Sequence, residues 1–315
     1  MSATTVKPAP VAAGAPRRRP GPRLTQRRRR QLAGLAMVSP ALLVVFVFFL
    51  VPLVMTFWMS LHDWPLLGEH SWVGLENYRL ALKDESWLDS VVFTLKYTLF
   101  ITPLLLVAAL ALAFLINRPG RPARVFQTIF FLPVVIGFAA AAYLWLYLTQ
   151  PGLGPLTDLA VHLGLGTRES NWFDTSTSAL TVVVLMVVWK MTGMQMILLL
   201  SGLQSIPAEL TEAARIDGAG PWKSFVHVTL PLLRPTLALV LVFSVAGSLL
   251  AFDQFFIMTS GGPSNSTITA VYQIYRTSFI NFDLGYGAAL SAMLMIVLAM
   301  VSAVQMLLLR KTDLS

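Results

Sequence analysis

The feature that most constrains this chain is a set of six long apolar segments separated by more polar stretches. Each is long enough to cross about 30 Å of hydrocarbon as an α-helix, which takes roughly 20 mostly apolar residues. Only 12% of the residues are charged, against about 25% in a typical soluble domain. The sequence therefore predicts an all-α integral membrane protein with six transmembrane helices. We expect these helices at residues 33–61, 89–117, 125–149, 179–203, 236–258 and 285–309.

The distribution of basic residues predicts how the chain is oriented. Nine of the 23 Lys and Arg lie in the first 30 residues. With both termini in the cytoplasm, 17 basic residues lie inside and four outside, and Lys96 and Lys190 fall within spans. Cytoplasmic loops carry such an excess of Lys and Arg, so we expect both termini to be cytoplasmic.

This topology divides the chain into four parts. Residues 1–32 form a basic cytoplasmic tail, which we expect to be disordered because its Pro, Ala, Gly and Arg cannot build a core. Nucleic-acid binding is the weaker interpretation of this tail, because no folded reader accompanies it. Residues 33–88 hold the first helix and an outer loop. The apolar segment of this helix is too long for the apolar core of a signal peptide. Residues 89–310 form a five-helix core, and 311–315 a cytoplasmic end.

Several kinds of chemistry are missing from the sequence. There is no cysteine, and the four histidines are scattered without the spacing of a metal site. The nearest string to a phosphate-binding loop, Lys223-Ser224, follows Trp222 where such a loop needs glycine. No set of acid, base and nucleophile converges either. We therefore expect no catalytic residue, no metal and no cofactor.

A polar hairpin at residues 204–235 separates the fourth and fifth apolar segments. Pro207 suits a helix start, and Gly218 follows the helix formers where a left-handed residue would end that helix. Gly220-Pro221 can start a second short helix, which Pro231 should end. We expect two short helices meeting at a bend, where small side chains let another protein approach closely. An ordinary amphipathic surface helix is the alternative, but it would not need such regular Gly and Pro.

The hairpin also carries a family resemblance. The spacing of Glu212-Ala213-Ala214, Gly218, Val228 and Leu230-Pro231 resembles the signature loop of permease subunits of binding-protein-dependent ABC importers, with Val228 where Ile is usual. Secondary motifs extend the likeness to the carbohydrate-uptake branch, and within it to the maltose-type F and glycerol-phosphate A permeases. These motifs are Gly74–Tyr78, Phe131–Pro133, Gly202–Pro207, Thr259–Pro263 and Gly285–Ala289.

This resemblance implies a type I ABC importer permease fold, in the cytoplasmic (inner) membrane of a bacterium or archaeon. It implies a transport subunit rather than an enzyme, with ATP bound and hydrolysed by a separate chain. The implied partners are a second homologous permease, two copies of a cytoplasmic ATPase, an extracytoplasmic solute-binding protein, the sugar and membrane lipid. The residues implied to dock into the ATPase are Glu212, Ala213, Ala214, Asp217 and Gly218.

The substrate path is less sharply defined by the sequence. A buried ammonium is costly in a membrane, so Lys190 either contacts substrate or pairs with Asp253 on the fifth segment. Positions that contact sugar in the maltose-type subunit are small or apolar here, so those detailed contacts do not transfer. Trp189, Gln195 and Gln254 offer stacking and hydrogen bonds, although such residues on a span more often serve helix packing. The candidate path residues are Trp189, Lys190, Met191, Met194, Gly247, Ser248, Ala251 and Asp253.

Together these features favour a permease subunit that forms half of the translocation path of an ATP-driven importer of mono- or oligosaccharides. Glycerol 3-phosphate or another polyol is the alternative cargo within the same class. A secondary transporter is the alternative from a different class. It would not need the glycine-hinged hairpin, and it would often carry a denser relay of ionisable groups.

Overall fold

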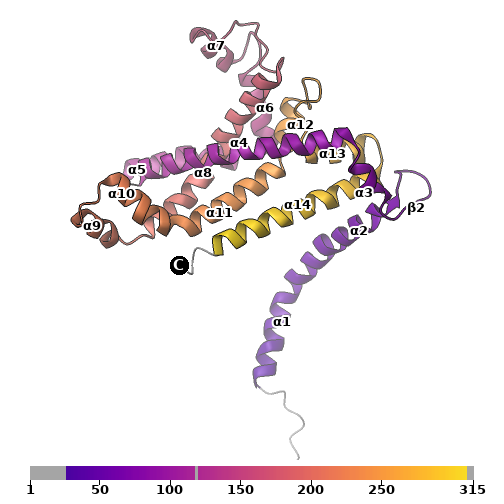
Figure 1. The fold of residues 1–315 in the computed structure, drawn as a ribbon, viewed down its shortest axis with the longest axis horizontal. Helices are drawn as coiled ribbons and strands as arrows, with labels where there is room; N and C mark the ends of the chain where they lie inside the picture. Colours follow the sequence, from indigo (N-terminus) through magenta and orange to yellow (C-terminus); the bar gives the residue numbers. More distant parts are fainter. Residues whose placement is uncertain (1–25, 118–119, 311–315) are drawn as a thin grey trace, which may run out of the picture. The chain divides into compact units, whose positions relative to one another are not determined.

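The computed structural model describes residues 26–117 and 120–310 (Figure 1). Most of the predicted disordered tail, residues 1–25, and the predicted end at 311–315 lie outside the described residues. Residues 26–32, also assigned to that tail, belong instead to helix α1 (Gln26–Val45), which begins before the expected span. This stretch consists of Gln, Arg and Leu, which are good helix formers.

The chain divides into two compact units, Met1–Val54 and Met55–Ser315. The described part of the first unit holds α1, a π-helical turn at Phe46–Leu50 and the start of α2 (Val51–Ser60). The helical stretch from Ala33 to Ser60 is long and apolar enough to cross a membrane. This agrees with the first predicted span.

Four long helices dominate the second unit and run alongside one another (Figure 1). Helix α8 is the central one, with 61% of its most apolar stretch buried against 33% for α4. Two glycines allow this close packing. A Cβ on Gly193 would overlap the Phe130 carbonyl oxygen of α5, and one on Gly202 would overlap the Thr236 side chain of α11. The four helices are α4 (Glu85–Ile116), α8 (Ser176–Gln204), α11 (Leu230–Leu249) and α14 (Leu284–Arg310).

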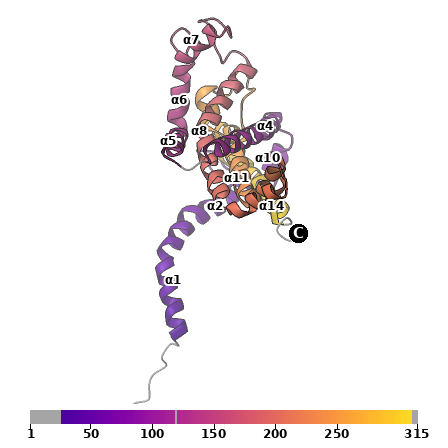
Figure 2. The same ribbon diagram turned by 90° about the vertical axis from the view of Figure 1, so that its left-hand side faces the viewer.

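The third predicted span is not a single helix. Helices α5 (Arg121–Val135) and α6 (Phe138–Leu148) meet at an angle of 99°, and Figure 2 shows α6 leading away from α5 towards α7. The expectation of one helix over 125–149 is therefore corrected. The chain turns at Ile136, which is extended, and Gly137, which directly precedes α6. Five described helices are long and apolar enough to cross a membrane, and the number is six if this bent pair counts as one span.

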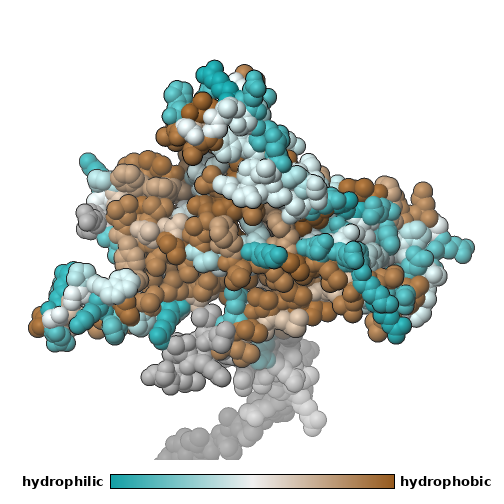
Figure 3. Space-filling view, turned by 45° about the horizontal axis from the view of Figure 1, so that its top comes forward, coloured by the Kyte–Doolittle hydropathy of each residue, from teal (hydrophilic) through white to brown (hydrophobic). Residues whose placement is uncertain are grey.

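Short elements connect the long helices of the second unit. Figure 3 shows hydrophobic side chains over the middle of one face, with hydrophilic side chains gathered mainly towards its ends and around α7. The only strands in the described residues are two short ones of two residues each, which pair antiparallel. The fold class is therefore all-α, as predicted. The connecting elements are β1 (His62–Asp63), β2 (Ser71–Trp72), α3 (Glu76–Ala81), α7 (Pro155–His162), α12 (Asp253–Met258), α13 (Ala270–Tyr275) and the π-helical turn η3 (Arg276–Ile280).

Candidate functional site

The hairpin between α8 and α11 begins with helix α9 (Ala208–Ile216). Gly218 follows it with φ of +80°, in the left-handed region that glycine adopts without steric cost. The N–H of Ala219 donates to the carbonyl oxygen of Ala214 at 2.9 Å, and the N–H of Gly218 donates to that of Arg215 at 3.0 Å. This pair of bonds is a Schellman motif, which satisfies the last carbonyls of the helix. The predicted glycine stop is confirmed.

The second half of the hairpin differs from the prediction. Helix α10 (Pro221–Ser224) does not end at Pro231 but continues through a π-helical turn, η2 (Phe225–Thr229), into α11. Pro231 lies in the first turn of α11, directly after the π-helical turn. A proline is tolerated there because the irregular hydrogen bonding of the turn precedes it. The second short helix is therefore the end of a long one.

The hairpin presents its side chains outwards. Helix α9 has no buried residue, and Ile216 and Trp222 are 86% and 74% exposed. The Phe225 ring packs edge-on against Phe114 of α4 at 5.2 Å, so the base of the hairpin is held by the helical core. Exposed large apolar side chains in a polar, firmly held loop are typical of a protein-binding surface. Of the five predicted ATPase-docking residues, Ala214 is half-buried and the others are exposed: Glu212, Ala213, Asp217 and Gly218.

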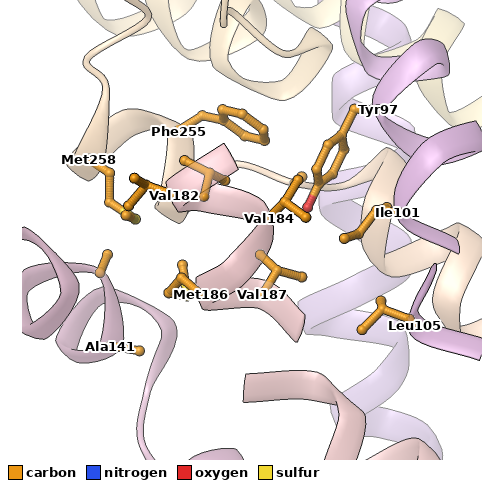
Figure 4. Close-up of a cluster of buried hydrophobic side chains, with 13 residues drawn as sticks. Tyr97, Ile101, Leu105, Ala141, Val182, Val184, Met186, Val187, Phe255 and Met258 are labelled. Carbon is orange, nitrogen blue, oxygen red and sulfur yellow. The ribbon is translucent and has the colours of Figure 1, made fainter. Parts of the chain in front are cut away.

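A cavity of about 230 Å³, which we call the inner cavity, lies among α4, α6, α8, α11 and α12. Its wall combines the rings of Tyr97, Phe138 and Phe243 with two glutamines and two serines. Figure 4 shows Tyr97, with Ile101 and Leu105 of the same helix, close to valines of α8. The buried Gln195 Oε1 and Ser244 Oγ, both in this wall, have no hydrogen-bond partner among the described residues. The cavity thus offers aromatic surface together with unpaired polar groups.

The structure brings half of the predicted path residues to this cavity. Met191, Met194, Gly247 and Ser248 line it, as do Gln195 and Gln254. Four predicted residues do not line it: Trp189 packs against Trp145, Lys190 and Ala251 are buried, and Asp253 is exposed at the start of α12.

Lys190 holds the bent third span together. Its ammonium donates to the carbonyl oxygen of Pro133 at 3.3 Å and to that of Ile136, and it lies 4.7 Å from the centre of the Phe138 ring. These carbonyls lie at the end of α5, where only the N–H of Ile136 also donates to the Pro133 oxygen, at 3.3 Å. The ion pairs of the described residues join Arg79 to Glu76 and Arg168 to Asp158. The suggested Lys190–Asp253 pair is therefore replaced by a cap on a helix end.

Sequence reasoning missed several residues of the cavity wall. Tyr97, Ile101 and Leu105 recur every fourth residue along α4, and Phe138, Phe243 and Ser244 lie on two other helices. A four-residue repeat indicates one face of a helix but does not reveal which neighbour that face meets. No group of three or more His, Asp or Glu in residues 26–117 and 120–310 could hold a metal ion.

The fold and these two features define a class: a multi-pass, all-α membrane transport component. Residues 78–313 match the family described as "Binding-protein-dependent transport system inner membrane component", and the chain belongs to this family. It is thus an inner-membrane permease subunit, a transport component rather than an enzyme. Its predicted membership of the ABC importer permeases is confirmed.

Relatives and solved structures agree with this assignment. The chain is 36% identical over 273 residues to the sn-glycerol-3-phosphate transport system permease protein UgpA of Pectobacterium atrosepticum, covering 85% of this chain and 91% of that protein. Its fold matches a crystal structure of a bacterial ABC transporter involved in the import of the acidic polysaccharide alginate, with a TM-score of 0.78, 21% identity, and coverage of 91% of this chain and 98% of that one.

A second crystal structure, of a bacterial alginate ABC transporter in complex with an alginate pentasaccharide-bound periplasmic protein, matches with a TM-score of 0.76 and 21% identity. It covers 90% of this chain and 95% of that one. These likenesses establish the type I ABC importer permease fold.

Proposed function

We propose that this permease forms half of the translocation path of an ATP-driven importer of mono- or oligosaccharides. A second, homologous permease supplies the other half, two copies of a cytoplasmic ATPase supply the energy, and an extracytoplasmic solute-binding protein delivers the sugar. ATP binds to the ATPase and not to this chain. Closure of the two ATPase copies then changes which side of the membrane can reach the path.

The observation that carries this proposal is the exposed hairpin. Its exposed side chains, Ile216 and Trp222 among them, suit binding to a protein partner. Its Schellman turn holds the backbone in one conformation, so the binding surface is rigid. In Figure 1 the hairpin lies at the same end of the second unit as the start of α5 and the C-terminal end of α14. Those segments carry Arg121, Arg124 and Arg310, which supports a cytoplasmic location for that end and for the C-terminus.

The inner cavity supports a sugar as cargo. Sugars present hydroxyl groups around an apolar ring, so they suit aromatic walls with a few hydrogen-bonding groups. Tyr97 and Phe243 provide rings, and Gln195 and Ser244 provide the unpaired oxygen atoms. A second candidate cargo, glycerol 3-phosphate or another polyol, is favoured by the 36% identity to glycerol-3-phosphate permeases.

The test is purification of the tagged chain from its own host, followed by reconstitution into liposomes. We expect one copy of this chain to hold two copies of an ATPase and one of a second permease, by native mass spectrometry. Uptake of a sugar panel, with glycerol 3-phosphate included, should require both ATP and the binding protein. Uptake driven by an ion gradient without an ATPase would instead indicate a secondary transporter and would refute the proposal.

A further inference from the structure

A second and larger cavity, of about 620 Å³, opens beside the first half of α4. We call it the outer cavity. Ser86, Asp89, Phe93 and Lys96 line it at intervals of three or four residues, so they share one face of α4. The opposite wall comes from the segment between Ser264 and Asn281. None of these residues belongs to the hairpin or to the wall of the inner cavity.

The outer cavity carries an excess of positive charge. Its lining residues include two cations, Lys96 and Arg276, and one carboxylate, Asp89. Lys96 is exposed although it lies in an apolar helix, and an ammonium facing lipid is costly, so this face of α4 requires a polar surrounding. Arg276 is fixed by Asn265, whose Oδ1 accepts from its Nη1 at 3.4 Å.

The outer cavity also contains a buried acceptor without a partner. Gln273 is 8% exposed, and its Oε1 has no hydrogen-bond partner among the described residues. Leaving a buried amide oxygen unpaired is destabilising, so its presence in a cavity wall calls for a functional explanation such as a ligand. The Gln273 oxygen can only accept hydrogen bonds, which a hydroxyl group donates.

The two cavities are close neighbours along α4. Phe93 lines the outer cavity and Tyr97, one turn further, lines the inner one. Both rings pack edge-on against Phe255 of α12, at 5.4 and 5.0 Å. The Phe255 side chain therefore contacts one ring from the wall of each cavity.

We propose that the outer cavity binds an acidic, hydroxylated solute, such as a sugar acid or a phosphorylated polyol, before it enters the inner cavity. Lys96 and Arg276 pair with the acidic group, and Gln273 Oε1 accepts from a hydroxyl. This inference rests on the proposed import function and narrows its cargo from sugars in general to acidic ones.

The test uses the absence of cysteine from the chain, which makes a single introduced thiol easy to follow. Val92→Cys places a thiol in the outer cavity, one turn from Lys96, and Leu67→Cys places one at an 88% exposed site outside it. Each variant, in the assembled importer in nanodiscs, reacts with an anionic and with a cationic methanethiosulfonate of similar size. We expect the ratio of anionic to cationic rate to be roughly tenfold higher for the Val92→Cys variant than for the Leu67→Cys variant.

Charge removal then identifies the source of this preference. In the Val92→Cys background, Lys96→Gln and Arg276→Gln should each lower the ratio several-fold, and Arg79→Gln, a basic residue outside the outer cavity, should not. Equal ratios at the two thiols, or a ratio unaffected by both charge removals, would overturn the proposal. The same assay in nanodiscs with and without anionic lipid separates a solute site from a lipid-headgroup site. Protection of the outer-cavity thiol by anionic lipid would also overturn the proposal.

Uptake provides a second measure, using sn-glycerol 3-phosphate and glucuronate as acidic probes and maltose as a neutral one. Lys96→Gln should raise the KM for a transported acidic probe several-fold and leave kcat nearly unchanged. Import of maltose alone, with no uptake of acidic probes, would overturn this inference but leave the sugar-import function intact. Failure of ATP-dependent uptake of every solute would refute the proposed function, whereas the labelling ratios would still report on the outer cavity.

Discussion

The hairpin and the inner cavity are built in opposite ways. The geometry of the hairpin comes from neighbours in sequence, because backbone hydrogen bonds from Ala219 to Ala214 and from Gly218 to Arg215 close the turn. The inner cavity comes from five helices, and its polar atoms at Gln195 and Ser244 are left unpaired inside the fold. Local backbone chemistry therefore determines the first region, whereas helix packing determines the second. Substitutions should separate them accordingly.

The largest effect is expected from Gly218→Trp. A Cβ at this position meets nothing within 4 Å, so the fold should survive, at a cost of about 1 kcal/mol for the left-handed backbone. The indole should block the partner that grips the turn, so ATP-driven uptake and ATPase co-purification should both be lost. Gly220→Ala is the matched control, since its φ is −65° and its Cβ is also unobstructed. Uptake at the wild-type rate by Gly218→Trp would contradict the docking role.

Lys190→Met should have the next largest effect, and on stability. The substitution removes the ammonium donor from the carbonyl oxygens of Pro133 and Ile136. The Pro133 oxygen keeps the N–H of Ile136 as a donor, so the free energy of unfolding should fall by about 1–3 kcal/mol. A thermal unfolding scan of the purified complex measures the loss, and Lys190→Arg should recover part of it. Lys190 does not line the inner cavity, so the KM of the surviving complex should change little. A raised KM at unchanged thermal stability would return Lys190 to the substrate path.

Gly247→Leu tests the inner cavity by filling it. A Cβ on Gly247 meets nothing within 4 Å, so the larger side chain should project into free space and raise the KM for the transported solute about tenfold or more. Gly193→Leu is the contrasting variant, because its Cβ would overlap the backbone of α5 and should prevent assembly. Equal assembly of the two variants would show that helix packing does not distinguish these glycines.

Ser244→Ala should have the smallest effect. Its hydroxyl has no partner among the described residues, so its removal should leave stability unchanged or slightly higher, but raise the KM by roughly fivefold if it binds substrate. Ser248→Ala is the control within the same wall, because its hydroxyl already donates to the Ser244 carbonyl oxygen at 2.9 Å. Identical KM values for both variants would argue against a hydrogen bond from solute to Ser244.

The same contrast explains how far the sequence could predict this structure. The glycine stop at Gly218 was predictable because a helix ends by local rules. The bend at Ile136 and Gly137 could not be predicted, because the apolar segment is continuous in sequence across it. The carbonyl oxygen of Ile136 accepts a hydrogen bond from Lys190, which is distant in sequence. Pro231 was predicted to end a helix, but the helix continues past it because a π-helical turn directly precedes α11.

The inner cavity was only half predictable for a related reason. Four of the predicted path residues, Met191, Met194, Gly247 and Ser248, do line it, since those positions keep their register along α8 and α11. The contributions of Tyr97 and Phe138 depend on how α4 and the bent span lie against α8, which no local pattern records.

The helix is continuous from Pro221 to Leu249, so the second half of the hairpin and α11 form one long helix. Trp222 and Ser248 lie about 40 Å apart along it, at roughly 1.5 Å per residue, yet no loop intervenes to absorb a displacement. A tilt of α10 by a few degrees would swing Gly247 and Ser248 by ångströms at the far end. Under the proposed function this run is a lever, which links the surface that docks to the ATPase with the wall of the inner cavity.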